Sequence, residues 1–228
     1  MAKKRTFKDY TQGASPAGTF VFPKLSEPDF KFQKEFGEYS VSLDLTGEDA
    51  ESFKKIIDAA VDTEYPFECE KEDKELDRGN LPYEQATDKD KEDIPGVTRF
   101  KFKRKAGGRY GKGHDKAGET WSAKIRLLDA AATRVVEEPI WGGTVGRVSF
   151  VLVPWVFQDS TGVRLQLDGA QILDLITKGE RSAESLGFSA EDGYSAPDDA
   201  TGQDVPDGDD ADTGADDELG EEAGGVEF

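Results

Sequence analysis

The sequence predicts a mainly β protein, a small closed barrel of five strands with one capping α-helix, followed by a disordered acidic tail. Several short stretches alternate apolar and polar residues, as half-buried strands do, and only one long stretch has helical spacing. The last forty residues hold fifteen Asp or Glu and no Lys, Arg or His. Such a segment cannot bury enough apolar surface to offset its ordering entropy. We therefore divide the chain into a folded domain, residues 1–188, and a tail, residues 189–228.

The first half of the domain predicts two or three strands and the helix. Residues 19–22 form a short strand that Pro23 ends, residues 30–32 are a second extended piece, and residues 38–45 alternate cleanly between apolar and polar side chains. Residues 46–49 have the spacing of a capping box with Asp in place of Glu. The apolar positions that follow have helical spacing: Phe53, Ile56, Ile57, Ala60 and Val61.

We expect this helix to end near Tyr65 and Pro66. Residues 62–93 hold thirteen acids against five bases and little periodicity, which indicates an exposed insert with some helix.

The second half predicts a basic hairpin. In residues 99–103, two phenylalanines face one way and three cations the other. Residues 105–118 form a glycine-rich basic loop, and residues 121–128 return as an alternating strand. If the two strands pair, their cations share one surface. This predicted basic stripe consists of Arg99, Lys101, Lys103, Lys124 and Arg126.

Further strands follow in residues 148–157 and 163–167, and Gly169 marks a bulge. Pro154 favours an edge or bent position in the first of them. One helix among five or six strands argues against a parallel α/β fold. Of the small closed barrels, the five-stranded OB-fold is the commonest of this size.

Charge and cysteine content limit the class of protein. The chain has a net charge of −19, but residues 1–188 carry 29 basic and 33 acidic residues. The acidity argues against passive wrapping of duplex DNA, whereas ten cations in residues 97–126 can still bind phosphates. The single Cys69 excludes an internal disulfide and indicates an intracellular protein. We expect no signal peptide and no membrane span.

Catalysis and cofactor binding find little support. His114 is the only histidine, so a metal site of usual spacing is not expected, and Cys69 lies in an acidic stretch that disfavours its thiolate. His114 also stands where a phosphate-binding loop needs Lys. A hydrolase that uses the scattered carboxylates, such as Glu137 and Glu138, is the weakest alternative. We predict no enzyme, no metal and no cofactor.

Binding of single strands needs cations that follow the backbone and aromatic faces for the bases. The basic stripe, together with Arg109 and Lys112 of the loop, supplies the cations. Tyr110, Trp155 and Phe157 are the candidate aromatics, and the alternative for Trp155 and Phe157 is that they are core residues. The stripe can also be a merely solvated face.

Several motifs together resemble a known family. They are AKK at residues 2–4, TRFKFK at 98–103, PIWGG at 139–143, LVPW at 152–155, VRLQL at 163–167, and an acidic C-terminus that ends in Glu227 and Phe228. In this order and spacing they resemble the single-stranded DNA-binding proteins of T7-type bacteriophages. The loop of residues 105–118 is more glycine-rich and basic than the family pattern, and residues 5–17 match it poorly.

The resemblance implies an OB-fold barrel with a capping helix that binds single-stranded DNA without sequence preference and anneals strands in DNA replication, recombination and repair. It assigns DNA contacts to Lys3, Lys101 and Lys103 and an aromatic pair to Trp155 and Phe157. It also implies a homodimer in the cytoplasm of the infected bacterial host. The tail would recruit the phage DNA polymerase and helicase-primase through Glu221, Glu222, Glu227 and Phe228.

The acidic tail leaves two alternatives open. By composition it is either a plain solubilising tail or a segment that competes with DNA for a basic groove. A second class of function is an acidic DNA mimic that inhibits a host nucleic-acid-binding protein. The clustered cations argue against that class, because a mimic has no use for them.

Overall fold

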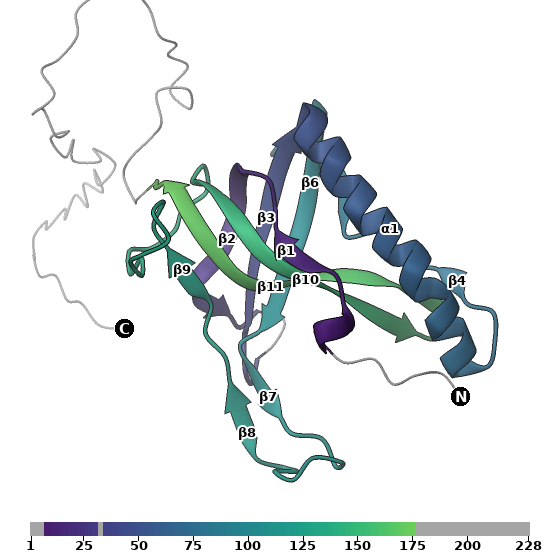
Figure 1. The fold of residues 1–228 in the computed structure, drawn as a ribbon. Coiled ribbons are helices and arrows are strands. Elements are labelled where there is room, and N and C mark those ends of the chain that lie inside the picture. The colour runs from purple at the N-terminus through teal and green to yellow at the C-terminus, as the bar shows by residue number, and fades with distance from the viewer. Residues whose placement is uncertain (1–6, 32–33, 177–228) are drawn as a thin grey trace, which may run out of the picture. The chain divides into compact units, whose positions relative to one another are not determined.

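The computed structural model describes residues 7–31 and 34–176, which all belong to the first of two units, residues 1–188. Figure 1 shows the arrangement of these elements. In chain order the elements are η1 (Phe7–Asp9), β1 (Gln12–Ala14), β2 (Gly18–Asp29), β3 (Glu38–Thr46), α1 (Gly47–Glu72), β4 (Asp77–Arg78), β5 (Tyr83–Thr87), β6 (Asp93–Lys105), β7 (Gly107–Arg109), β8 (Thr120–Ser122), β9 (Arg126–Leu128), β10 (Val145–Phe157) and β11 (Ser160–Asp174). Within the described part, no helix has the length and apolarity that a membrane crossing requires.

The protein is mainly β with one α-helix, as predicted, and its long strands pair in a ring. β2, β3 and β6 form an antiparallel meander, and β10 pairs antiparallel with both β2 and β11. β6 also pairs with β11 through a short parallel contact, and β11 pairs with β10, so the pairings close into a ring. α1 lies along one side of these strands (Figure 1).

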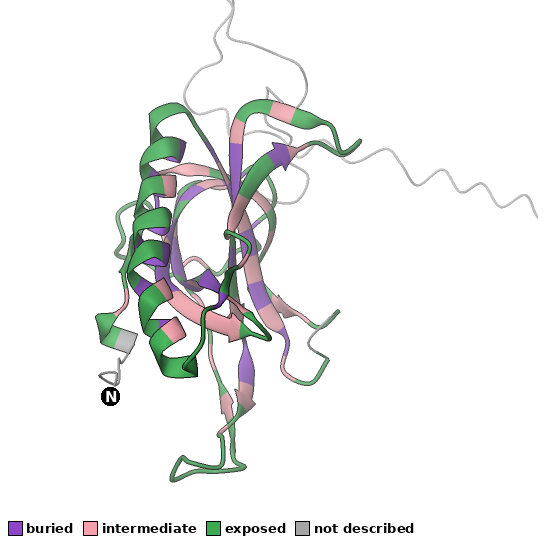
Figure 2. Ribbon diagram, turned by 90° about the vertical axis from the view of Figure 1, so that its right-hand side faces the viewer, coloured by how far each residue is buried: buried purple, intermediate pink, exposed green. Residues whose placement is uncertain are grey.

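The core lies on the inner face of these strands and under α1. Phe53 of α1 is its centre, because its ring packs 4.8 Å from Phe100, 5.1 Å from Phe150 and 6.2 Å from Phe102, measured between centroids. All four rings are buried. Figure 2 shows buried residues along the long strands, whereas the projecting β7–β8 hairpin is largely exposed. The alternation predicted for residues 38–45, 99–103 and 163–167 therefore identifies the inner face correctly at the aromatic and aliphatic positions.

The helix is longer than predicted. α1 continues through Pro66 to Glu72 and ends at Asp73, whose left-handed backbone directs its N–H to the carbonyls of Cys69 and Glu70. The Thr46 side chain makes no capping hydrogen bond, so the predicted capping box is wrong.

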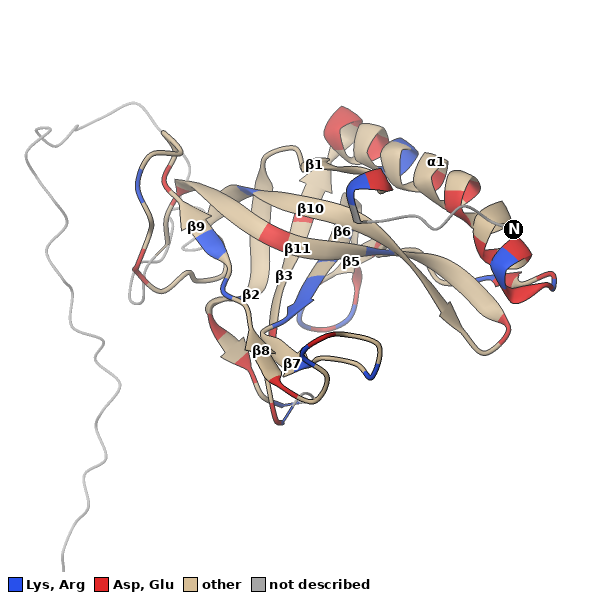
Figure 3. Cartoon of the chain, turned by 60° about the horizontal axis from the view of Figure 1, so that its bottom comes forward, with Lys and Arg blue, Asp and Glu red and all other residues tan. Residues whose placement is uncertain are grey.

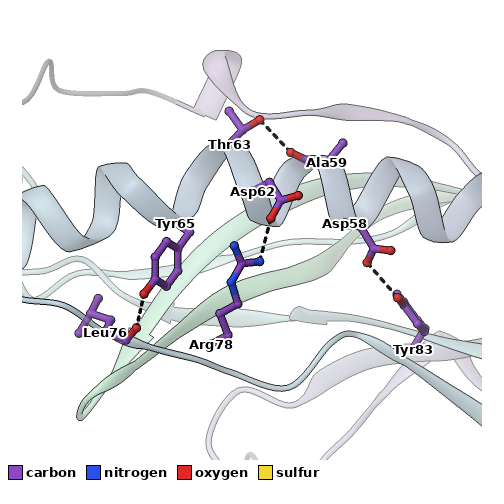
Figure 4. A network of polar contacts seen from close by, with 8 residues as sticks. All are labelled: Asp58, Ala59, Asp62, Thr63, Tyr65, Leu76, Arg78 and Tyr83. Carbon is purple, nitrogen blue, oxygen red and sulfur yellow. Dashed lines mark hydrogen bonds and ion pairs between the residues drawn. The ribbon is translucent and has the colours of Figure 1, made fainter.

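Two side chains of the turn before the proline contact the chain that follows α1 (Figure 4). The Tyr65 hydroxyl donates to the Leu76 carbonyl at 2.6 Å, and Arg78 bonds Asp62 at 2.8 Å while lying over the Tyr65 ring. The chain that follows α1 thus packs back onto the helical turn that precedes Pro66.

The predicted pairing of residues 99–103 with residues 121–128 is wrong. β6 pairs instead with β3 along most of its length and with β5, which the sequence analysis assigned to the exposed insert. β3 offers buried Val41 and Leu43 opposite Phe102 and Phe100, so this pairing buries four side chains. Of the predicted hairpin, only the short strands β7 and β8 pair with each other, and β9 pairs in parallel with β11.

Two smaller predictions concern the long strands. β2 does not end at Pro23 but continues to Asp29, with shifts in its register against β3. The register of β10 and β11 shifts between the pairs Ser149–Gly169 and Phe150–Leu167, which confirms the bulge predicted beside Gly169.

Candidate nucleic-acid interface

Lys101 and Lys103 lie on the outward face of β6, as alternation with buried Phe100 and Phe102 predicts. Each lysine contacts one carboxylate: Lys101 Nζ lies 2.7 Å from Glu84 and Lys103 Nζ lies 3.3 Å from Glu38. Exposed pairs of this kind are worth only about 0.2–1 kcal/mol. A phosphate can therefore replace either carboxylate at little cost.

Arg99 does not belong to this exposed surface. Only 8% of the residue is accessible, and its guanidinium donates two hydrogen bonds of 2.7 Å to the Asp44 carboxylate and one of 3.1 Å to the Thr87 carbonyl. The hydrogen bonds to Asp44 raise the pKa of Arg99 further above its usual value. The prediction that Arg99 faces solvent is wrong, because β3 and β5 flank this end of β6.

Lys124 and Arg126 are exposed, but they do not lie on a strand paired with β6 beside Lys101 and Lys103. Together with Arg104, near the C-terminal end of β6, they line a pocket of about 360 Å³ beside β11. Arg126 is level with Gly169, and Arg104 bonds Asp168 at 2.7 Å. Figure 3 shows the two cationic regions on β6 and on β9. The predicted stripe is thus divided into two groups.

The loop candidates lie on the projecting β7–β8 hairpin. Arg109 bonds Glu35, with Nε 3.2 Å from the carboxylate oxygen. The Tyr110 ring stacks on His114 at 4.3 Å between centroids and 19° between planes. Lys112 is exposed. One face of Tyr110 is therefore already covered, and the hairpin offers chiefly cations.

Trp155 and Phe157 point outward from β10, since buried Val148, Phe150 and Leu152 occupy the inward positions. Phe157 is 67% exposed and cannot be a core residue.

The Trp155 indole is half-buried and lies against two glycines. A Cβ on Gly79 would lie 2.3 Å from its Cη2, and a Cβ on Gly162 would lie 3.0 Å from its Cζ2. Both aromatic side chains are thus on the surface, and glycines support the indole.

Arg164 is the residue that the sequence analysis missed. It is exposed on β11, opposite Val153 of β10. The parallel register of Leu165 with Phe102 makes Arg164 level with Lys101. Alternation within residues 163–167 already places Arg164 on the polar face, so the signal was present in the sequence.

Three neighbouring strands thus form one outward face, which we call the β6–β11–β10 face. It carries cations on β6 and β11 and aromatics on β10. Its members are Lys101, Lys103, Arg164, Trp155 and Phe157.

Some predicted residues lie outside the described residues: Lys3, Glu221, Glu222, Glu227 and Phe228. Among residues 7–31 and 34–176, no group of three or more His, Cys, Asp or Glu side chains could hold a metal ion.

Comparisons with known proteins identify the family of the chain. A relative, the single-stranded DNA-binding protein of Enterobacteria phage T3, is 29% identical over 210 residues, which cover 82% of this chain and 84% of that protein. The crystal structure of gp2.5, the single-stranded DNA-binding protein of bacteriophage T7, has a similar fold, with a TM-score of 0.61 and 23% identity over 82% of this chain and all of that one. The single-stranded DNA-binding protein of bacteriophage Enc34, solved with single-stranded DNA, has a TM-score of 0.51 at 14% identity and covers 71% of this chain and 85% of that one. The family model of the bacteriophage T7 single-stranded DNA-binding protein matches residues 18–175, more than half of the chain, and the protein therefore belongs to that family.

Proposed function

We propose that this protein binds single-stranded DNA without sequence preference across the β6–β11–β10 face. The observation that carries the proposal is the juxtaposition of Lys101, Lys103 and Arg164 with Trp155 and Phe157 on three adjacent strands. Cations beside aromatic faces are the two components that single-strand binding requires. The names of the family and of its phage T3 member support the same ligand.

The chemistry of binding follows from the contacts of these side chains. Lys101 and Lys103 exchange their carboxylate partners for phosphates, and Arg164 adds a third cation. Bases stack on Phe157 and on the exposed part of Trp155. Every base has a π-face and every nucleotide a phosphate, so such contacts carry no sequence preference.

We also propose that the fold is an OB-type barrel with α1 as its cap. The ring of pairings β2–β3–β6–β11–β10 and the parallel β6–β11 contact support a closed five-stranded arrangement. In an OB-fold the strand surface and its flanking loops bind oligonucleotides.

The biological role that we propose is the coating and annealing of single strands during phage DNA replication, recombination and repair, without enzymatic activity. We further propose a homodimer in the cytoplasm of the infected bacterium. Its acidic tail, ending in Glu221, Glu222, Glu227 and Phe228, would recruit the phage DNA polymerase and helicase-primase. Family membership and the composition of residues 189–228 support this part of the proposal.

A comparison of single-stranded and duplex ligands tests the function. Fluorescence anisotropy with labelled oligothymidylate should give an affinity much higher than with duplex DNA of equal length, falling as salt rises. The variant that combines Lys101→Ala with Lys103→Ala should weaken only the single-strand binding. Equal affinity for duplex and single strand would refute the proposal.

A further inference from the structure

A bulge in β2 changes the direction of one aromatic side chain. Val21 pairs with Ser42 and Lys24 pairs with Ser40, so β2 supplies two residues, Phe22 and Pro23, where β3 supplies one. Alternation from buried Phe20 would turn Phe22 inward as well. The extra residue changes the alternation at this point, as β-bulges do when they re-aim a side chain.

Phe22 itself has an unusual backbone and an unusual exposure. Its φ is +49°, a left-handed conformation that bulky residues rarely adopt. Its side chain is the most exposed of the large hydrophobic ones in the described part, at 73%. Backbone strain of this kind concentrates at functional sites, so the strained backbone and the exposed ring together indicate a ligand site.

Phe22 opens onto an apolar pocket of about 640 Å³. The loop that carries Trp141, which is 42% exposed, forms the opposite part of the lining. The Ile140 N–H donates to Ser26 Oγ at 3.2 Å, and the Gly143 N–H donates to the Phe20 carbonyl at 2.9 Å. Because these bonds tie the loop to β2, the pocket is formed before any ligand arrives.

The strand register connects the pocket to the β6–β11–β10 face. Lys24 lines it and pairs with Ser40, which pairs with Lys103, which in turn is level with Gln166. These residues lie side by side across β2, β3, β6 and β11. With strands about 4.8 Å apart, Lys24 is about 10 Å from Lys103, a short step for a single strand.

The charges of the pocket favour a base over a phosphate. Glu27 and Glu137 line it together with the single cation Lys24. Carboxylates repel phosphate but accept hydrogen bonds from the N–H groups of bases, in thymine from N3–H. Aromatic walls with this polar lining therefore suit an unpaired nucleobase whose phosphate stays over Lys24 and Lys103.

We propose that the pocket lined by Phe22 and Trp141 is a second base-binding subsite for the strand that crosses Lys101 and Lys103. The inference rests on the proposed single-strand binding and extends its path over β3 to β2. Phe22 belongs neither to the family motifs nor to the predicted stripe, and Trp141, although part of the PIWGG motif, was not predicted to contact DNA.

The test measures affinity for oligothymidylates of about 6 and about 15 nucleotides, within the range that one OB-fold covers. The variant that combines Phe22→Ala with Trp141→Ala should bind the longer oligonucleotide about 5- to 150-fold more weakly, as the loss of one stacked base implies. The shorter one should lose little. The slope of log affinity against log salt should not change, because no phosphate contact is removed. Ile56→Ala, an exposed side chain on α1, is the matched control and should change neither affinity.

The outcomes separate this inference from the proposed function. If the double variant binds the longer oligonucleotide like the wild type while Lys101→Ala with Lys103→Ala weakens it, the subsite is refuted. If the wild type shows no preference for single strands, the proposed function fails first. Should Phe22→Ala not fold, Phe22→Gly keeps the left-handed backbone without strain and replaces it.

Discussion

Residues 99–103 of β6 follow one alternating pattern, yet the cations at the two ends of this stretch have opposite surroundings. At one end Arg99 is buried and holds Asp44 and the Thr87 carbonyl. Two and four residues later, Lys101 and Lys103 are exposed, each beside one exposed or half-exposed carboxylate. β5 pairs with β6 only as far as Phe100. Alternation thus determines the face of a side chain, whereas a strand from a distant segment determines whether that face meets solvent.

The largest loss of stability should come from removing the buried Arg99 side chain. Arg99→Ala leaves the Asp44 carboxylate without its bidentate partner in a buried site, so we expect a loss of about 3–5 kcal/mol in the free energy of unfolding. Urea denaturation measures it. Affinity for single strands, measured on the remaining folded protein, should not change.

A matched replacement controls for the loss of charge. Combining Arg99→Met with Asp44→Leu removes both charges and keeps apolar volume, so it should cost much less than Arg99→Ala alone. If Arg99→Ala instead weakens DNA binding at unchanged stability, the comparison between the two ends of β6 is wrong.

Trp155→Ala tests the aromatic part of the exposed face. We expect a loss of about 1–3 kcal/mol in affinity for oligothymidylate, because one stacking surface is removed. The melting temperature should change little, since the indole is only half-buried on Gly79 and Gly162. Trp155→Phe should restore most of the affinity. A variant that melts far below the wild type would assign Trp155 to the core.

Combining Lys101→Ala with Lys103→Ala tests the exposed end of β6 directly. Each phosphate contact that is lost should reduce the slope of log affinity against log salt by about 0.7, so the pair should reduce it by about 1.4. Stability should change by less than about 1 kcal/mol per exposed pair. Salt titrations by anisotropy give the slope.

If the variant that combines Lys101→Ala with Lys103→Ala keeps the wild-type slope, the outward face of β6 does not contact the strand. The same titration on the variant that combines Lys124→Ala with Arg126→Ala shows whether the second cationic group contacts it.

Local pattern predicted much of this structure and of its candidate site. Alternation identified the buried phenylalanines of β6 and the exposed Lys101 and Lys103, and the order of short motifs identified the family. The burial of Arg99 could not be predicted, because β5 comes from an acidic stretch with no strand periodicity. The outward turn of Phe22 depends on a bulge, which one strand alone does not reveal. In both cases the missing information was the pairing between strands that are distant in the sequence.

The smallest effect concerns Tyr83, which belongs to the strand that flanks the buried end of β6. Its ring packs 5.6 Å from Phe100, and its hydroxyl donates to Asp58 at 2.9 Å (Figure 4). Tyr83→Phe keeps the ring and removes the hydrogen bond, so we expect a loss of about 0.5–1.5 kcal/mol at neutral pH.

Tyr83 should also make the free energy of unfolding depend on pH in the alkaline range. Burial, and then the hydrogen bond to Asp58, raise the pKa of its hydroxyl to about 12. In the unfolded chain the pKa is about 10, so the folded state favours the neutral phenol. This stabilisation is complete below about pH 10 and is lost as pH rises towards about 12. Urea denaturation at about pH 8 and about pH 11 should therefore show a larger loss in the wild type than in Tyr83→Phe, and the other tyrosines cancel in the difference. Equal losses in the two proteins would mean that Tyr83 does not hold its proton more tightly in the folded state.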